Sequence, residues 1–327
     1  MKKLILIGLF ALVATFVSGL LCLPILKRLK AGQPILKYVE SHEGKNGTPT
    51  MGGLFFILPA VITFFIFGGG RMAVVSAVIG LAFMFVGFID DFIKVKFKRN
   101  EGLKAYQKIL FQGAIAIVAG VFCFNNGITV YYLPFTKKSV ELGLITIPFV
   151  SLIFIATTNC VNLTDGLDGL AGSSCAVYFV FMALLIGAQT VSMEHLYLQT
   201  QEYYSLQMLC VCLVGALLGF LIFNTNKASV FMGDTGSLSL GGLVAGISIF
   251  SSNALFIPLI GIIFVTSGIS VIVQVLYFKR TKKRVFLMAP LHHHFQLKGY
   301  SESKITYVYA LITCVLGVFS VLGYIWG

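Results

Sequence analysis

The chain has 327 residues, of which 57% are hydrophobic and only 11% are charged, and its mean hydropathy is +0.93. This composition excludes an ordinary soluble domain, because one core cannot enclose so much apolar surface. The net charge of +12 comes from basic residues in short segments between apolar runs, a pattern that argues against a nucleic-acid partner. The seven cysteines form no CxxC pair and indicate neither disulfides nor a thiolate metal site.

Ten apolar runs follow one another along the chain, and most approach the roughly 20 residues that span a bilayer. They are residues 4–26, 52–67, 72–89, 109–124, 143–161, 170–189, 204–223, 236–250, 255–278 and 305–326. The sequence therefore predicts an all-α integral membrane protein, with residues 1–327 forming one polytopic domain of ten transmembrane helices.

The orientation follows from the positions of Lys and Arg. The segments after the first, third, fifth, seventh and ninth spans carry 19 of the 24 basic residues, which predicts that these five loops are cytoplasmic and both termini extracytoplasmic. Nine of the twelve acidic residues lie on the same side, so we expect the active site there. On the opposite side, residues 128–142 alternate around a proline and predict a small hairpin.

The third span ends in the sequence GFIDDFIK, with Asp90, Asp91 and Lys94. Two carboxylates at a membrane edge are costly unless they meet a cation or solvent. Lys94 follows Asp90 by four residues and shares its helix face. The motif indicates either a solvated helix end or a site that binds a metal or a substrate.

The loop after the fifth span places Asn162, Asp165 and Asp168 at three-residue intervals, with glycines between them. Such groups match the donors and acceptors of a nucleoside or the shell of a cation, although a plain turn and helix cap has the same composition.

Asp234 lies at the start of the eighth span, between glycines that permit close backbone approach. A simple cap is again the alternative. Three acid-bearing loops on one side together favour a divalent-metal site with oxygen ligands, most simply Mg²⁺.

The loop after the ninth span contains a basic run from Lys279 to Arg284, interpreted as a topology signal or an anionic-lipid contact, and then His292, His293 and His294. No HExxH or cysteine partner supports zinc. Imidazoles that meet phosphate oxygens fit better with carboxylates that bind Mg²⁺.

Two further segments carry cations. The first cytoplasmic loop ends in KNGTPTMGG, in which Lys45 and Thr50 make either an anion-binding turn or a plain junction, and Lys108 opens the fourth span. No P-loop is present. A Mg²⁺ site with cations and hydroxyl groups at the membrane edge indicates phosphoryl transfer between a soluble nucleotide and a lipid phosphate.

Five phrases in order carry a family resemblance: GTPTMGG from Gly47, DDFIK from Asp90, NLTDGLDGLAG from Asn162, FMGDTGSLSLGG from Phe231 and APLHHHF from Ala289. The chain resembles, over essentially its whole length, the phospho-N-acetylmuramoyl-pentapeptide transferase family of the polyprenyl-phosphate N-acetylhexosamine-1-phosphate transferases. The resemblance implies that UDP-MurNAc-pentapeptide and undecaprenyl phosphate react with Mg²⁺ to give lipid I and UMP. It also implies a homodimer in the bacterial plasma (inner) membrane.

The resemblance further implies roles for individual residues. Asp234 and Asp91 match metal ligands, and Asp90 matches a group that acts on the lipid phosphate. The other catalytic candidates are Asn224, Lys108 and His293. The substrate-binding candidates are Lys45, Thr50, Lys94, Asn162, Asp165, Asp168, Phe231, Gly233, Gln274, Ala289, His292 and His294, with Phe231 stacking on uracil.

One residue departs from the family pattern, because Gln296 stands where the family usually has Glu after HHHF. Two alternatives to the main hypothesis are a sister enzyme that moves GlcNAc-1-phosphate from UDP-GlcNAc and, in a different class, a secondary transporter. Transporters usually hold polar groups near the bilayer midplane, whereas the acids here gather at one edge. The residues leave open whether transfer is direct or passes through an aspartyl-phosphate.

Overall fold

The computed structural model describes residues 2–28, 47–98, 101–136, 138–192 and 197–326. Over these residues the chain is almost wholly helical, as the apolar runs predict. The long helices, in chain order, are α1 (Lys2–Arg28), α2 (Leu54–Phe67), α3 (Arg71–Phe97), α4 (Ala105–Asn125), α5 (Thr146–Thr164), α6 (Leu170–Ser192), α7 (Tyr197–Asn224), α8 (Gly233–Phe250), α10 (Ile262–Thr281) and α12 (Glu302–Trp326).

Shorter elements connect the long helices. They are the 3₁₀ turns η2 (Gly143–Ile145) and η3 (Ala254–Phe256), the helices α9 (Ile257–Ile260) and α11 (Leu291–Leu297), and the strands β1 (Val130–Tyr132) and β2 (Ser139–Glu141). The two strands pair antiparallel, with Val130 opposite Glu141, which confirms the hairpin predicted within 128–142. The backbone N–H of Tyr132 donates to the carbonyl of Ser252, so the hairpin is tied to the turn that follows α8.

Eight helices of the described chain are long and apolar enough to cross a membrane: α1, α3, α4, α5 with η2, α6, α7, α10 and α12. The other two predicted spans coincide with α2, which has 14 residues, and with α8, which has 18. The chain is therefore a multi-pass membrane protein. The count of ten spans stays a prediction, as does the side on which the termini lie.

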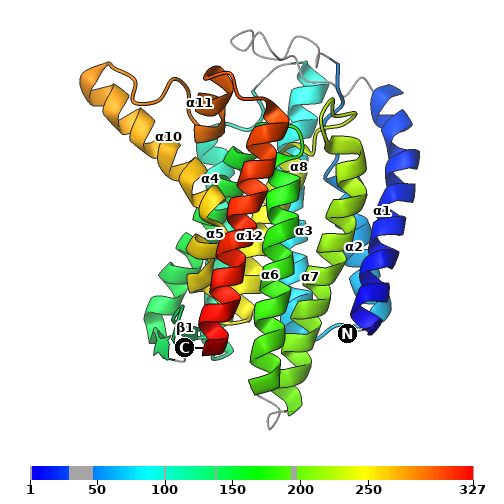
Figure 1. Cartoon of the computed structure of the whole chain (residues 1–327), viewed down its shortest axis with the longest axis vertical. Helices are drawn as coiled ribbons and strands as arrows, with labels where there is room; N and C mark the ends of the chain where they lie inside the picture. The colour runs from blue at the N-terminus through cyan, green and yellow to red at the C-terminus, as the bar shows by residue number, and fades with distance from the viewer. Residues whose placement is uncertain (1, 29–46, 99–100, 137, 193–196, 327) are drawn as a thin grey trace.

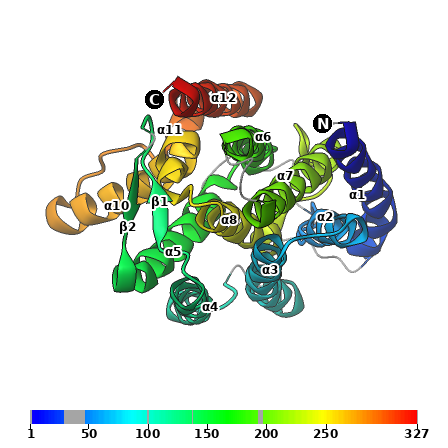
Figure 2. The same cartoon turned by 90° about the horizontal axis from the view of Figure 1, so that it is seen from below.

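Helix α8 is the centre of the bundle. Every residue from Thr235 to Phe250 is buried, and Figure 2 shows α8 enclosed by its neighbours, with α3, α5 and α7 close around it. Small residues permit this close packing, as in many membrane bundles. A Cβ at Gly87 of α3 would collide with the carbonyl group of Asp234, and Ser239 donates a 2.9 Å hydrogen bond to the carbonyl of Gly80.

The ninth predicted span, residues 255–278, is not one helix. It is divided into η3, α9 and α10, and the break falls at Gly261. Pro258 stands in the first turn of α9, and a Cβ at Gly261 would crowd the carbonyl of Ile257 at 2.8 Å. After the break α10 leans away from the bundle (Figure 1).

The two ends of the bundle differ in what they carry. At one end, α3 and α5 finish and α6, α8 and α12 begin, and α11 lies there too (Figure 1). We call this the acid-bearing end, because Asp90, Asp91 and Asp234 belong to it. At the other end lie the hairpin and the turn 251–253, together with the first residues of α1 and the last residues of α12 (Figure 1), and we call it the hairpin end.

Candidate active site

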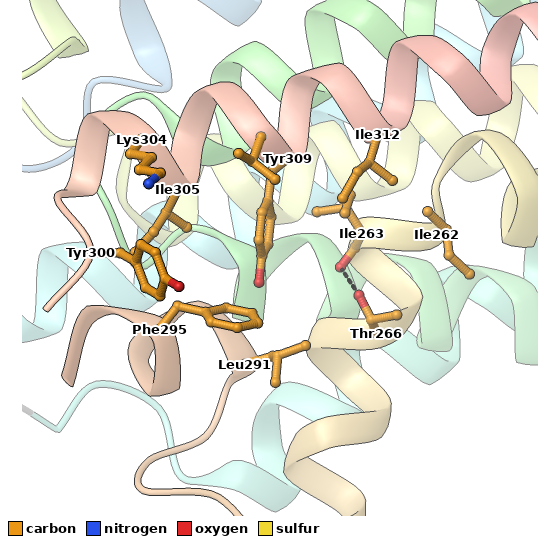
Figure 3. A pocket seen from close by; sticks show the side chains of 11 residues that line it. Ile262, Ile263, Thr266, Leu291, Phe295, Tyr300, Lys304, Ile305, Tyr309 and Ile312 are labelled. Atoms are coloured by element: carbon orange, nitrogen blue, oxygen red, sulfur yellow. Dashed lines mark hydrogen bonds between the residues drawn. The ribbon is translucent and has the colours of Figure 1, made fainter. Parts of the chain in front are cut away.

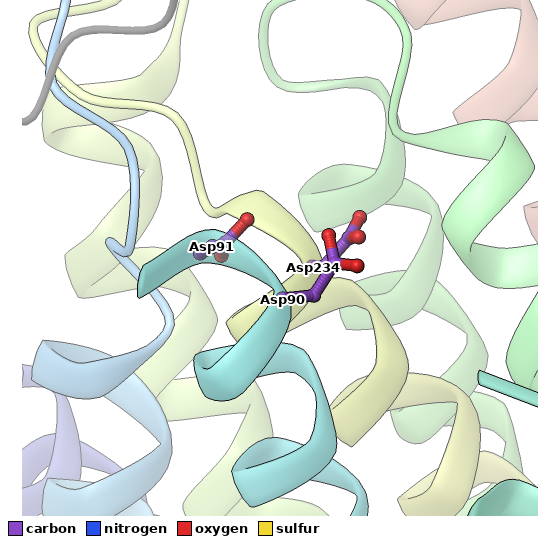
Figure 4. A group of neighbouring side chains, drawn as sticks. All are labelled: Asp90, Asp91 and Asp234. Carbon is purple, nitrogen blue, oxygen red and sulfur yellow. The ribbon is translucent and has the colours of Figure 1, made fainter. Parts of the chain in front are cut away.

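Three carboxylates meet at the acid-bearing end. Asp90 and Asp91 come from the last turns of α3 and Asp234 from the first turn of α8 (Figure 4). One oxygen of each lies within 4.8 Å of the others. The close crossing at Gly87 brings the two helices together at this point. The structure thus joins the three acids that the sequence assigned to one centre.

Two lysines neutralise part of this charge. The Nζ atom of Lys94 lies 2.7 Å from Asp90 Oδ2 and 3.1 Å from Asp234 Oδ2. Lys108, from the first turn of α4, hydrogen-bonds Asp234 and lies 3.3 Å from Asp90 Oδ1. Three carboxylates and two ammonium groups leave one net negative charge. The centre is therefore suited to receive a further cation.

Asp91 is held on one side only. Its Oδ2 accepts hydrogen bonds from the backbone N–H and the hydroxyl of Thr235, at 2.9 and 2.7 Å. Its Oδ1 is buried and has no hydrogen-bond partner among the described residues, and Lys94 Nζ is 3.8 Å away. An unpaired buried carboxylate oxygen is costly, and metal coordination is one way in which proteins satisfy it.

The loop between α5 and α6 reaches the same centre. Asn162 donates from Nδ2 to Asp234 Oδ1 at 2.8 Å and to Ser237 Oγ at 2.7 Å. Burial, and then the charges of Asp234, Asp91 and Asp168, raise the pKa of Asp165 to about 8. The raised pKa favours the neutral carboxyl form, which both donates and accepts hydrogen bonds.

Asp168 and Asn224 hold two loops together. Asp168 Oδ2 accepts the backbone N–H of Ala228 at 3.1 Å. Asn224 accepts the N–H of Gly169 at 3.2 Å and donates to the carbonyl of Val230 at 2.8 Å. These bonds connect the loop after α5 to the loop after α7. The catalytic assignment of Asn224 and the substrate-binding assignment of Asp168 stay predictions.

The segment that leads into α2 pairs with the segment that leads into α8. The N–H of Phe231 donates to the carbonyl of Pro49 at 2.8 Å, and the N–H of Gly52 donates back to Phe231 at 2.9 Å. Gly233 has φ of 68°, a conformation that favours glycine. A Cβ at Gly233 would meet Asp91 Oδ2 and Thr50 Oγ1. Gly233 and Thr50, both predicted to bind substrate, therefore border the acids. Lys45, predicted beside them, lies outside the described residues.

The three consecutive histidines occupy different surroundings. His292 is fully buried, and burial, together with the charge of His293, lowers its pKa to about 3. The rings of His292 and His293 lie 4.4 Å apart, and a Cβ at Gly166 would collide with Nε2 of His292 and lie 3.0 Å from that of His293. These two histidines therefore border the turn that follows Asp165.

The remaining predicted residues lie along α10 and the segment before α11. Gln274 accepts the N–H of Phe286 at 2.9 Å, and His294 Nδ1 accepts the N–H of Leu287 at 3.1 Å. Gln274 and Ala289 line a cavity of about 650 Å³. Its other lining residues include the basic side chains of Lys279 and Arg284.

A second cavity, of about 360 Å³, is apolar and lies between α10, α11 and α12 (Figure 3). Ile263, Phe295 and Tyr309 form part of its wall, and Lys304 lies at its edge. Ile263 and Tyr309 also pack in one cluster with Leu167, so this cavity adjoins the loop between α5 and α6.

Sequence reasoning missed several residues that hold the centre. Thr235 and Ser237 bond to Asp91 and Asn162, and the backbone N–H of Leu103 donates to Asp90 at 2.8 Å. The signal for the two hydroxyls was present, since they follow Asp234 within one helical turn. A backbone donor such as Leu103 leaves no trace in residue type.

This centre gathers three carboxylates and two lysines at one end of a helical membrane bundle, and matches to known protein families identify its class as a transferase. Residues 72–252 match the family described as glycosyl transferase family 4. Residues 45–57 match the phospho-N-acetylmuramoyl-pentapeptide-transferase signature 1.

Individual relatives agree with these matches. Proteins named phospho-N-acetylmuramoyl-pentapeptide-transferase from Thermoanaerobacter sp. (strain X514) and Clostridioides difficile (strain 630) are 42% and 39% identical to the chain, and each alignment covers 96% of both proteins. A protein of the same name from Caldanaerobacter subterraneus subsp. tengcongensis is 41% identical over 316 residues. The chain belongs to the phospho-N-acetylmuramoyl-pentapeptide-transferase family.

Proposed function

We propose that the chain transfers phospho-MurNAc-pentapeptide from UDP-MurNAc-pentapeptide to undecaprenyl phosphate, giving lipid I and UMP. The observation that carries the proposal is the acid centre, which consists of Asp90, Asp91 and Asp234 with Lys94 and Lys108. The chain that holds this centre aligns over 96% of its length with relatives that bear the transferase name. The centre lies where a helix bundle meets its surface loops, the depth at which a lipid phosphate and a soluble nucleotide can meet.

Mg²⁺ is the cofactor that we propose for this centre. The donor set fits it, because the ligands are carboxylate oxygens, and the Oδ1 of Asp91, which lacks a hydrogen-bond partner among the described residues, lies 3.8 Å from Lys94 Nζ. Asp234 and Asp91 would hold the ion. When bound, it would supply positive charge that stabilises the charge developing on the phosphates during transfer. Its two positive charges would convert the net charge of the centre from −1 to +1.

The lysines take a second role once substrates bind. Lys94 and Lys108 pair with carboxylates in the structure, and both carry flexible ammonium groups that can turn to phosphate oxygens. An oxygen of the lipid phosphate forms a bond to the phosphorus attached to the sugar. The bond from that phosphorus to the bridging oxygen breaks, and UMP leaves with the electron pair. Asp90 accepts the proton that a protonated lipid phosphate gives up.

We propose direct transfer in place of an aspartyl-phosphate intermediate. Asp90, the acid assigned to the lipid phosphate, accepts the N–H of Leu103 and is paired with both lysines, so it is poorly placed to turn and attack phosphorus. Chiral labelling of the transferred phosphate should give inverted configuration. Retention of configuration, or a phosphorylated Asp trapped in a single turnover, would exclude direct transfer.

The nucleotide is proposed to bind between the loop after α5 and the segment before α8. Asn162 and Asp165 offer hydrogen-bonding groups, and Phe231 offers a partly buried ring for stacking on uracil. Thr50 and Gly233 adjoin the acids, where the diphosphate would lie.

The polyprenyl chain needs an apolar path beside the centre. The cavity of Figure 3 has apolar walls and adjoins the loop after α5 through Leu167. Lys304 at its edge adds a positive charge that suits a phosphate-bearing lipid.

The setting of the enzyme is also a proposal. We assign the chain to the bacterial plasma membrane, with the acid-bearing end in the cytoplasm, because UDP-sugars are soluble and 19 of the 24 basic residues lie in the loops assigned to that side. A homodimer is proposed on the family resemblance. Cysteine labelling from each side of sealed vesicles tests the orientation, and mass measurement in detergent tests the dimer.

The function is tested by offering membranes that contain the chain either UDP-MurNAc-pentapeptide or UDP-GlcNAc, with undecaprenyl phosphate and Mg²⁺, and by measuring UMP release. We expect release from UDP-MurNAc-pentapeptide. Release from UDP-GlcNAc alone would replace the proposal by the sister reaction. An absence of release from both donors, with the lipid acceptor present, would reject both.

A further inference from the structure

Gln296 and Glu302 connect a histidine at the active site to the loop after α5. His293 Nδ1 and Gln296 Oε1 lie 3.0 Å apart, both on α11. Gln296 Nε2 lies 3.3 Å from Oε1 of Glu302, at the start of α12, and the other carboxylate oxygen of Glu302 faces the backbone N–H of Asp168 at 3.4 Å. A chain of hydrogen bonds thus runs from His293 to Asp168.

The direction of this chain is set by Glu302. An ionised carboxylate accepts hydrogen bonds and cannot donate them. The amide nitrogen of Gln296 must therefore face Glu302, which leaves the amide oxygen of Gln296 to face His293. An amide oxygen only accepts, so Nδ1 of His293 must carry the hydrogen. In the neutral ring Nε2 is then the acceptor.

That acceptor atom lies beside the proposed nucleotide site. A Cβ at Gly166 would come within 3.0 Å of His293 Nε2. Among the described residues, the titratable groups near the ring include His292, at 4.4 Å between ring centres, and Glu302, which is connected through Gln296. Asp165 and Asp168 flank Gly166, whose added Cβ would approach the ring. The tautomer of His293 therefore decides whether the site presents an acceptor or a donor at this position.

A glutamate at position 296 would change the arrangement. It could accept from His293 Nδ1, but it could not donate to Glu302. Two carboxylates would then face each other across the gap that is now bridged at 3.3 Å, and like charges at that distance repel. With Gln at position 296, the amide N–H group donates to Glu302 and this repulsion is absent.

We propose that Gln296 is a positioning residue that, together with Glu302, fixes the Nδ1-protonated tautomer of His293 and turns its Nε2 toward the loop after α5. The inference rests on the proposed function for its effect on turnover, but the tautomer itself is a property of the chain alone. Gln296 acts through its contact with His293.

The first test reads the tautomer. Histidine labelled with ¹⁵N in the full chain, reconstituted in liposomes at pH 8, gives separate signals for protonated and unprotonated ring nitrogens, and loss of a signal in His293→Gln assigns His293. We expect Nδ1 protonated in the wild-type chain. In Glu302→Gln the carboxamide of Gln296 is no longer held in one orientation, so we expect both tautomers. A wild-type His293 protonated on Nε2 would overturn the proposal.

The second test exchanges the two groups. Gln296→Glu should reduce the kcat of UMP release at least tenfold, because the two carboxylates repel. In the double variant Gln296→Glu with Glu302→Gln, the amide at position 302 can donate to the carboxylate at position 296 and accept from Asp168, so turnover should return to within about threefold of wild type. The variant Lys298→Gln is the matched control, since it also changes the net charge by −1 but lies at an exposed position.

Two results of the exchange would contradict the inference. One is a Gln296→Glu variant that is as active as wild type, and the other is a double variant as impaired as the single one although its melting temperature is normal. A wild-type chain that releases no UMP from any donor would reject the proposed function and leave the tautomer result standing. The two failures are therefore distinguishable.

Discussion

The two ends of the bundle treat buried polar groups in opposite ways. At the hairpin end Gln189 and Asn253 are fully buried, and their amides exchange two hydrogen bonds at 2.7 and 2.9 Å. Glu202 there accepts the first two backbone N–H groups of α3, at 3.0 and 2.9 Å, and so caps the helix. At the acid-bearing end three carboxylates share two lysines, and Asp91 keeps an oxygen with no hydrogen-bond partner among the described residues.

The difference distinguishes buried polar groups that stabilise the fold from those that serve the active site. A buried polar group that only stabilises a fold is expected to be fully paired, because an unpaired one costs about 1–3 kcal/mol. At the hairpin end the Gln189–Asn253 pair and Glu202 meet that expectation, and the neutral hydroxyl of Thr146 is the exception among the described residues there. The acid-bearing end keeps crowded charges whose cost is offset only when a cation and phosphates bind. Substitutions at the two ends should therefore affect different measurements.

The largest effect is expected from Asp234→Asn. The substitution removes a carboxylate that two lysines and Asn162 hold, and with it a proposed Mg²⁺ ligand, so UMP release should fall about a thousandfold. The melting temperature is measured alongside, because the substitution also removes the ion pairs of Asp234 with Lys94 and Lys108. The matched acid-to-amide change at the hairpin end, Glu202→Gln, should leave kcat within a factor of two. An Asp234→Asn variant within tenfold of wild-type activity would break the comparison.

A smaller effect is expected from Gly166→Ala. The added methyl group collides with Nε2 of His292, so the loop after α5 must move away from α11. We expect kcat/KM for the nucleotide donor to fall about 10- to 100-fold. Gly113→Ala is the control, because a Cβ at Gly113 meets no atom within 4 Å. Equal kinetics for the two variants would show that the contact between this loop and the histidines does not matter for turnover.

At the hairpin end the effect should fall on stability. Asn253→Leu leaves the buried amide of Gln189 without its partner, and the free energy of unfolding should fall by about 2 kcal/mol. Turnover per folded molecule should not change. Thermal melting in detergent and the kcat of the surviving fraction measure the two quantities. Adding Gln189→Leu should recover part of the loss, and a double variant whose loss equals or exceeds the sum of both single losses would contradict the pairing.

The smallest effect concerns pH. Because burial lowers the pKa of His292 from 6.5 to about 3, the unfolded chain binds a proton that the folded chain does not, and stability falls as pH drops below 6.5. At pH 5.5 this group should cost about 1.4 kcal/mol relative to pH 7.5. Melting curves at the two pH values should show less acid sensitivity in His292→Gln than in His294→Gln. The same acid sensitivity in both variants would exclude His292 as the cause.

Hydropathy predicted the helical membrane fold, and charged residues at span ends predicted acids gathered at one side. The family resemblance selected Asp90, Asp91 and Asp234, which the structure brings together. The sequence predicted a continuous helix over 255–278, and the break at Gly261 was missed. Apolar periodicity does not reveal where a membrane helix divides. The Pro258 and Gly261 pair was the available signal.

The hydrogen-bond partners of the site residues were harder to predict than the site residues themselves. Asp168 and Asn224 were selected as functional residues by their positions in motifs, yet in the structure they also bond to the backbone of neighbouring loops. The bond from Gln296 to Glu302 joins residues six apart on two different helices, and only the turn between α11 and α12 brings them together. Sequence spacing does not specify such turns.

The most direct test of the central claim is to measure UMP release from UDP-MurNAc-pentapeptide and undecaprenyl phosphate after divalent cations are removed by chelation and after Mg²⁺ is restored. The acid centre predicts that release stops on chelation and returns with Mg²⁺, while Asp234→Asn stays inactive in both states. Full activity of the wild-type chain in the chelated state would contradict the account.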